Sequence, residues 1–184
     1  MKKRLLILLL LLPSLLMAQD FAAYARKVAK DWNIVGSALA VIKDDKMVMA
    51  EGFGERVKGS GRAVDANTVF QIGSVTKSFT ATLMAMMVED SLVRWEDPVK
   101  MYLLEFEMFD PWLTDNLQVR DLFLHRTGLP SQGGTYIPCL GYDRDDVFDM
   151  IKYMPLATSP RTTYAYNNII FLVAQRIIES VTGK

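Results

Sequence analysis

A serine and a lysine stand three positions apart at the start of an apolar segment. Ser74 follows Gly73, and Lys77 comes three residues later. In a helix, residues i and i+3 project from the same face with Cβ atoms about 5–6 Å apart, so these side chains can share a proton. A serine hydroxyl becomes a nucleophile when an adjacent base accepts its proton, and a lysine serves as base when burial or nearby cations lower its pKa. The spacing therefore indicates covalent catalysis in a turn that the fold must bury.

The same pattern also has a purely structural interpretation. Ser74 could cap the helix by accepting a hydrogen bond from a backbone amide of the first turn. Lys77 would then extend into solvent along the helix surface. Ser-x-x-Lys is a short motif that also occurs by chance. Taken alone, it favours neither interpretation.

The segment after Ser74 predicts the helix that would carry both residues. Apolar side chains recur at helical spacing over residues 75–88, and Glu89 and Asp90 end the run. A helix that is apolar nearly all round belongs in the interior of a domain. We therefore expect this helix to be buried. Val75, Phe79, Leu83, Met86 and Met87 recur at this spacing, while Ala81, Met84, Ala85 and Val88 fill much of the other face.

A second polar motif precedes the last apolar segment. Tyr166, Asn167 and Asn168 lead into a helical pattern over residues 168–181, and Gly183 follows as a stop signal. One of the two asparagines could cap this helix while the tyrosine packs with its hydroxyl outward. By itself, this stretch is better explained by capping than by chemistry.

The other segments predict a small α+β arrangement around these motifs. An amphipathic helix over residues 21–32 precedes two strands, 36–43 and 47–54, which a polar turn at 44–46 joins without a glycine. Two strands alone form a marginal sheet, so the hairpin requires further strands that the chain does not clearly offer. Short helices are expected at 119–125 and 145–154, and loops at 55–67, 92–99 and 131–142.

Composition excludes several classes of function. The chain has 184 residues, is 51% hydrophobic and carries 21 basic and 21 acidic residues, so it is one globular domain or part of one. Apart from Lys2, Lys3 and Arg4 there is no basic block, and we predict no nucleic-acid partner. With one histidine and one cysteine, Cys139, the sequence predicts no zinc cluster, internal disulfide or cofactor.

The N-terminus has the pattern of a secretory signal at residues 1–19. A basic start is followed by an apolar run over residues 5–16, which Pro13 interrupts, and then by the small residue Ala18. This run is shorter than the roughly 17–25 residues of a spanning helix, so we expect no stable membrane anchor. The protein is predicted to be exported, to the periplasm or the medium.

Taken together, these segments resemble the beta-lactamase-related serine hydrolase family, which includes class C beta-lactamases, penicillin-binding D-alanyl-D-alanine peptidases and related esterases. The resemblance implies an α+β fold of the beta-lactamase/transpeptidase type, with the Ser-x-x-Lys helix packed on an antiparallel sheet. Four blocks carry it in order: the opening strand at 36–41, the nucleophile motif at 70–77, the stretch at 119–130, and the tyrosine motif at 164–168 with the ending at 181–184.

The resemblance also implies a role for each candidate site residue. Ser74 corresponds to the acylated nucleophile, Lys77 to its partner base or proton store, and Tyr166 to the second member of the proton relay. Asn168 would orient the substrate or Lys77. Tyr164 is expected to pack, and His125 to form structural hydrogen bonds. Residues 110–112, the 131–142 loop and Arg161 are expected near the substrate by position.

The family's third motif, a Lys-Thr-Gly or His-x-Gly triplet on a strand, does not occur in this sequence. Thr182, Gly183 and Lys184 stand at the end of a predicted helix, so they do not match that triplet. In the family, that strand supplies one oxyanion donor, and losing one donor typically costs about 10²–10³ in rate. We therefore expect residues 20–184 to be the N-terminal part of a longer hydrolase domain, lacking the C-terminal strands and helix, with weak or no activity alone.

The leading hypothesis is an exported serine hydrolase that forms an acyl-enzyme with an amide or ester. Its small-molecule or peptide substrate would be a beta-lactam, a D-amino-acid peptide or a small ester. A non-catalytic binding or sensor domain and a decayed fragment are the alternatives. The presence of Ser74, Lys77 and Tyr166 favours the enzyme. The sequence leaves the oligomeric state open.

Overall fold

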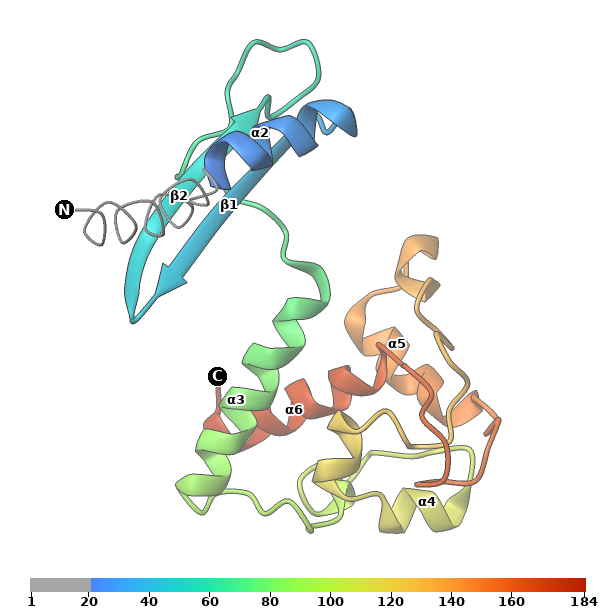
Figure 1. Cartoon of the computed structure of the whole chain (residues 1–184). Helices are drawn as coiled ribbons and strands as arrows, with labels where there is room; N and C mark the ends of the chain where they lie inside the picture. The colour runs from blue at the N-terminus through green and yellow to red at the C-terminus, as the bar shows by residue number, and fades with distance from the viewer. Residues whose placement is uncertain (1–20) are drawn as a thin grey trace, which may run out of the picture. The chain divides into compact units, whose positions relative to one another are not determined.

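The computed structural model describes residues 21–184, so the predicted signal sequence lies outside the described residues. The chain forms two compact units, of which the first ends at Gln71 and the second covers Ile72–Lys184 (Figure 1). Each unit has its own packing and is considered by itself.

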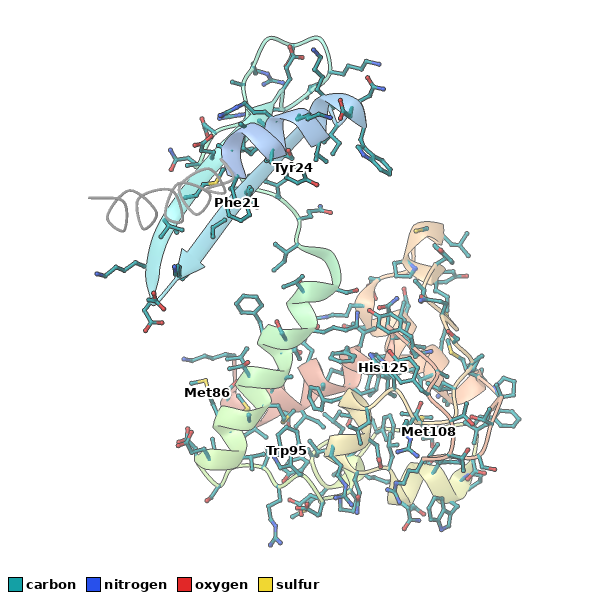
Figure 2. All side chains as sticks on the ribbon, viewed as in Figure 1. Phe21, Tyr24, Met86, Trp95, Met108 and His125 are labelled. Atoms are coloured by element: carbon teal, nitrogen blue, oxygen red, sulfur yellow. The ribbon has the colours of Figure 1, made fainter. Side chains whose placement is uncertain are left out.

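The described part of the first unit is a helix on a β-hairpin. Helix α2 (Phe21–Asp31) packs against the antiparallel strands β1 (Gly36–Lys43) and β2 (Lys46–Gly54). Phe21 and Tyr24 project from α2 (Figure 2). The predicted helix and both strands are confirmed, with β2 beginning one residue earlier than expected.

The hairpin turn contains two residues, not the three that we predicted. Lys43 pairs with Lys46, which leaves Asp44 and Asp45 as the turn, with φ angles of 50° and 59°. Positive φ at both central positions is typical of a type I′ turn, which matches the twist of the strands. Aspartate tolerates the left-handed region better than most residues, which explains how the turn forms without glycine.

The second unit is an assembly of helices around one apolar core. Helix α6 (Ile170–Thr182) runs through it and contributes four fully buried side chains, Ile170, Val173, Ala174 and Ile177. The other helical elements are η1 (Gly73–Val75), α3 (Thr76–Glu89), η2 (Val99–Met101), α4 (Pro111–Asn116), η3 (Val119–Phe123), η4 (Ile137–Leu140), α5 (Arg144–Met150) and η5 (Ile151–Tyr153). Both α3 and η3 pack against α6 (Figure 1). The predicted helices near 119–125, 145–154 and 168–181 are confirmed with shorter or shifted bounds.

Three helical elements in this unit, η2, α4 and η4, were not predicted. Helix α4 follows Asp110, whose side chain accepts a hydrogen bond from the Leu113 amide at 2.9 Å, and Pro111 occupies its first turn. An aspartate followed by proline is a helix start signal, but a helix of six residues shows little periodicity. The predicted loop over residues 131–142 contains the short η4 helix.

The expectation that α3 is buried nearly all round is wrong. Met84 and Met87 are the buried residues of α3, whereas Val75, Phe79, Leu83 and Met86 are between 47% and 61% exposed. Figure 2 shows Met86 pointing away from the second unit. The core of this unit packs against the side of α3 that carries Met84 and Met87. Because the helix is apolar nearly all round, its sequence does not indicate which side the core will contact.

Candidate active site

Ser74 and Lys77 lie together at the start of α3. Ser74 occupies the single 3-10 turn η1, and Lys77 lies in the first turn of the α-helix that continues it. Lys77 Nζ donates a hydrogen bond to Ser74 Oγ at 3.2 Å. The Ser74 side chain makes no capping hydrogen bond. The structure therefore has the i, i+3 pair, and the capping interpretation of Ser74 is wrong.

Tyr166 reaches the same serine from a distant part of the chain. Its hydroxyl donates to Ser74 Oγ at 2.7 Å across a sequence separation of 92 residues. The Tyr166 backbone is held by the Gln132 amide, which donates to its carbonyl oxygen at 2.7 Å. Ser74 Oγ thus accepts hydrogen bonds from both an ammonium and a phenol.

Asn168 contacts the lysine and not the serine. Its Oδ1 accepts a hydrogen bond from Lys77 Nζ at 2.6 Å. Its Nδ2 donates to Gln132 Oε1 and to Thr135 Oγ1, each at 3.1 Å. Gln132 and Thr135 were not predicted individually. Their only signal was the expectation that the 131–142 loop lies near the substrate.

The neighbouring Asn167 has a structural role. Its side chain is buried, and its Oδ1 accepts from the Ile170 amide at the start of α6. Its Nδ2 donates to the carbonyl oxygens of Pro130 and Gly133, both at 3.1 Å. Asn167 therefore has the capping role, and Asn168 positions Lys77. The sequence left open which of the two asparagines would cap the helix.

The charge of Lys77 acts on both neighbouring titratable rings. Lys77 Nζ lies 4.9 Å from the Tyr166 ring centroid. Interaction with Lys77, and then the hydrogen bond to Ser74, lower the pKa of Tyr166 below its ordinary value. Burial, and then the Lys77 charge, lower the pKa of His125. A lower phenol pKa makes a phenolate, the form that can accept a proton, more accessible near neutral pH.

The His125 ring packs against the ring of Tyr166. Its ring centroid lies 4.4 Å from that of Tyr166, and its Nδ1 accepts a hydrogen bond from the Asn167 amide at 3.3 Å. Figure 2 shows His125 within the second unit. These contacts agree with the structural hydrogen-bonding role expected for this histidine.

An open cavity of about 580 Å³ lies beside Ser74. Helices α3 and α6 form its walls through Gly73, Ser74, Lys77, Asn168, Phe171 and Gln175, among others. Lys77 is the one charged side chain in this lining. A carbonyl group placed here would meet the serine oxygen, with a cation beside it.

Arg161 and residues 110–112 do not line this cavity. Arg161 instead binds the buried carboxylate of Asp121, with Nη2 at 2.7 Å from Oδ2 and Nε at 3.1 Å from Oδ1. Because both charges are used in this ion pair, the expectation that Arg161 lies near the substrate is not supported by the geometry.

The described residues offer neither a metal-binding cluster nor a membrane-spanning helix. Between residues 21 and 184, no group of three or more histidine, cysteine, aspartate or glutamate side chains is arranged to hold a metal ion. In the same range, none of the helices has both the length and the apolar character needed to cross a membrane.

Comparison with known proteins matches this chain to the Beta-lactamase family and to relatives that are hydrolases. The family described as Beta-lactamase matches residues 21–184. The chain is 38% identical to "Unguisins hydrolase ungD" of Aspergillus violaceofuscus over 173 residues, which are 90% of this chain and 30% of that protein. It is 28% identical to the "Teichoic acid D-alanine hydrolase" of Staphylococcus aureus over 153 residues, 83% of this chain and 36% of that protein.

The fold is similar to that of solved structures as well. The octameric penicillin-binding protein homologue from Pyrococcus abyssi superimposes with a TM-score of 0.73 at 25% identity, covering 91% of this chain and 40% of that one. The predicted beta-lactamase/transpeptidase-like fold class is thereby confirmed. This chain spans about a third of the length of the curated relatives that it matches.

Proposed function

The chain belongs to the beta-lactamase family, whose relatives named above are hydrolases, and on that premise we propose that Ser74 is the acylated nucleophile of a serine hydrolase. One observation carries the proposal: Ser74 Oγ accepts hydrogen bonds from both Lys77 and Tyr166, beside an open cavity. A hydroxyl between a cation and a phenol has a route for its proton and an electrostatic partner for the charge that remains.

In the first step, Ser74 Oγ attacks the carbonyl carbon of an ester or amide. The hydroxyl proton passes to the Tyr166 oxygen after that phenol has lost its own proton to solvent. When the tetrahedral intermediate collapses, the bond to the alcohol or amine breaks, and the leaving group takes the proton from Tyr166. Tyr166 therefore acts first as a general base and then as a general acid.

In the second step, water attacks the acyl-serine ester. Its proton passes to the Tyr166 oxygen and from there to Ser74 Oγ as the ester bond breaks, which releases the carboxylic acid and restores the serine. Lys77 stays beside the serine oxygen throughout, held by Asn168 Oδ1 at 2.6 Å. Its positive charge stabilises the negative charge that passes between the two oxygens.

The sequence leaves three substrates open, a beta-lactam, a D-amino-acid peptide and a small ester, and the one proposed is an amide or ester of a D-amino acid. One named relative, the teichoic acid D-alanine hydrolase, supports this choice. A D-amino-acid group at an envelope polymer also agrees with the proposed export through the segment at residues 1–19. Export is tested by the N-terminal residue of the protein recovered from the periplasm or medium, expected near Gln19 or Asp20.

The nucleophile is tested by covalent labelling. The complete protein, rather than residues 20–184 alone, is purified, incubated with a fluorophosphonate probe, digested and analysed by mass spectrometry. We expect one adduct on Ser74, absent from Ser74→Ala. Ser78→Ala is the matched control, since Ser78 lies one turn further along α3 and its hydroxyl donates to the Val75 carbonyl at 2.7 Å. An unlabelled wild-type protein, or an adduct that persists in Ser74→Ala, would contradict the proposal.

A further inference from the structure

Aromatic rings from two segments face the site lysine. Phe171 lies in the first turn of α6, and Tyr166 lies in the segment before it. Lys77 Nζ is 4.9 Å from the Tyr166 ring centroid and 5.3 Å from that of Phe171. His125 contacts both rings, at 4.4 Å from Tyr166 and 5.5 Å from Phe171. The lysine therefore lies over two rings that a third ring supports.

These contacts distinguish an ammonium from a neutral amine. The face of an aromatic ring carries partial negative charge and attracts a cation within about 6 Å of its centroid. The Asn168 carbonyl oxygen accepts a hydrogen bond from the same nitrogen at 2.6 Å. Both interactions are stronger when the lysine carries its positive charge.

The titratable groups around Lys77 leave this cation without a carboxylate partner. Ser74 faces it from η1, Tyr166 from the segment before α6, and His125 from the segment after η3. Over residues 21–184, no aspartate or glutamate forms an ion pair with Lys77. The rings and the amide therefore provide the stabilisation that an acidic residue would otherwise give.

We infer that Phe171 is a positioning residue for the proposed reaction, because its ring, together with the Tyr166 ring and the Asn168 carbonyl oxygen, holds the Lys77 ammonium group beside Ser74. The inference rests on the proposed function and deepens it. A lysine that keeps its proton cannot be the base that accepts the serine proton. Tyr166 then takes that role, and Lys77 makes its phenolate easier to form.

The test changes the charge distribution of the ring without changing its shape. Phe171 is replaced by phenylalanines of increasing fluorination, up to pentafluorophenylalanine, each step weakening the attraction for a cation. A cation–π contact of about 0.5–2 kcal/mol predicts a decrease of about 2- to 30-fold in the rate of Ser74 labelling near neutral pH. The pH at which labelling reaches half its maximum should rise across the series, because Tyr166 loses the help of the cation.

The matched control is the same series at Phe123. That ring packs edge-on against Phe171 with centroids 5.5 Å apart, whereas the rings that face Lys77 are those of Tyr166 and Phe171. Fluorination there changes the aromatic packing alone, so we expect an unchanged labelling rate. An equal decrease in both series would show that packing is responsible and would overturn the inference.

A second measurement separates this inference from the proposed function. The Tyr166 ζ-carbon is followed by NMR as the pH is raised, and its titration midpoint should rise as fluorination at Phe171 increases, because Lys77 is held less firmly beside the phenol whose pKa it lowers. A midpoint that stays constant across the series overturns the inference, even where Ser74 labels normally. A wild-type protein that fails to label at Ser74 contradicts the hydrolase proposal, and the NMR series still tests the contact between ring and cation.

Discussion

Tyr166 and Asn168 are two positions apart in the sequence, yet their side chains contact different members of the site. Tyr166 binds the serine oxygen, and Asn168 binds the lysine nitrogen. Asn167, between them, turns inward and fixes the backbone through three hydrogen bonds. Two functional side chains can therefore project on one side because the intervening residue anchors the segment on the other.

The phenol hydroxyl should be essential for acylation. Tyr166→Phe keeps the ring over Lys77 and removes the oxygen that receives the serine proton, so labelling of Ser74 should slow by about 10²- to 10⁴-fold. In the wild-type protein the rate should increase with pH and reach half its maximum below the pKa of an ordinary phenol, because the Tyr166 pKa is lowered. Incubation with the probe, quenched at a series of times and carried out at pH values from 6 to about 10, measures the loss of rate in the variant and the pH dependence of the wild-type rate.

Tyr164→Phe is the control for that substitution. Tyr164 is exposed, lies two residues earlier in the same segment and contacts His125 edge-on at 5.6 Å. Its hydroxyl should be dispensable. A similar loss of rate in Tyr164→Phe and Tyr166→Phe would mean that the segment is sensitive to any change, and that the proton relay is not its cause.

His125 should make folding sensitive to mild acid. Its pKa is lowered in the folded state, so the unfolded chain binds more protons as the pH falls below about 6.5. This contribution to stability is therefore complete above that pH and is lost progressively as the pH falls toward the folded-state value. Protonation would also remove the lone pair on Nδ1 that accepts the Asn167 amide.

The substitution His125→Asn tests this linkage. Asparagine tolerates the φ of 53° at this position better than most residues, and its side-chain oxygen can accept the same amide. The variant should be less stable than wild type at pH 8, because it loses ring contacts, and the difference should shrink by pH 5. Urea unfolding at both pH values measures the gap. A constant gap would contradict the assigned titration.

At the scale of the elements, the sequence predicted those with a clear period or a strong stop signal. Strand β1 appears with the predicted bounds, and α6 ends before Gly183, whose φ of 68° is the left-handed C-cap that glycine favours. The Ser74–Lys77 contact was also predictable, because it depends on helical spacing alone. Local geometry is sufficient for such features.

Features that depend on tertiary contacts could not be predicted in this way. Helix α3 is apolar on several faces, and only the position of α6 decides that Met84 is buried and Phe79 is exposed. Gln132 and Thr135 join the site through Asn168, a partner more than thirty residues away. Neither a period nor a short motif carries that information. The role of Tyr166 came instead from the resemblance to a family.

At the scale of the whole molecule, every site residue discussed here belongs to the second unit, Ile72–Lys184. Ser74 and Lys77 come from its start, and Tyr166 and Asn168 from the segment before its last helix. The match to the Beta-lactamase family extends over both units. The curated relatives are about three times as long as the region that this chain matches.

The contact between Ser74 and Tyr166 spans 92 residues, so the reactive serine exists only when both ends of the second unit are in place. The fraction of protein labelled at Ser74 then also measures the fraction that is natively folded. With increasing urea, the labelled fraction after a brief exposure to the probe should fall along the same curve as the tryptophan fluorescence of the unfolding protein. Labelling that persists beyond the unfolding transition would mean that the Ser74–Lys77 turn reacts without its tyrosine.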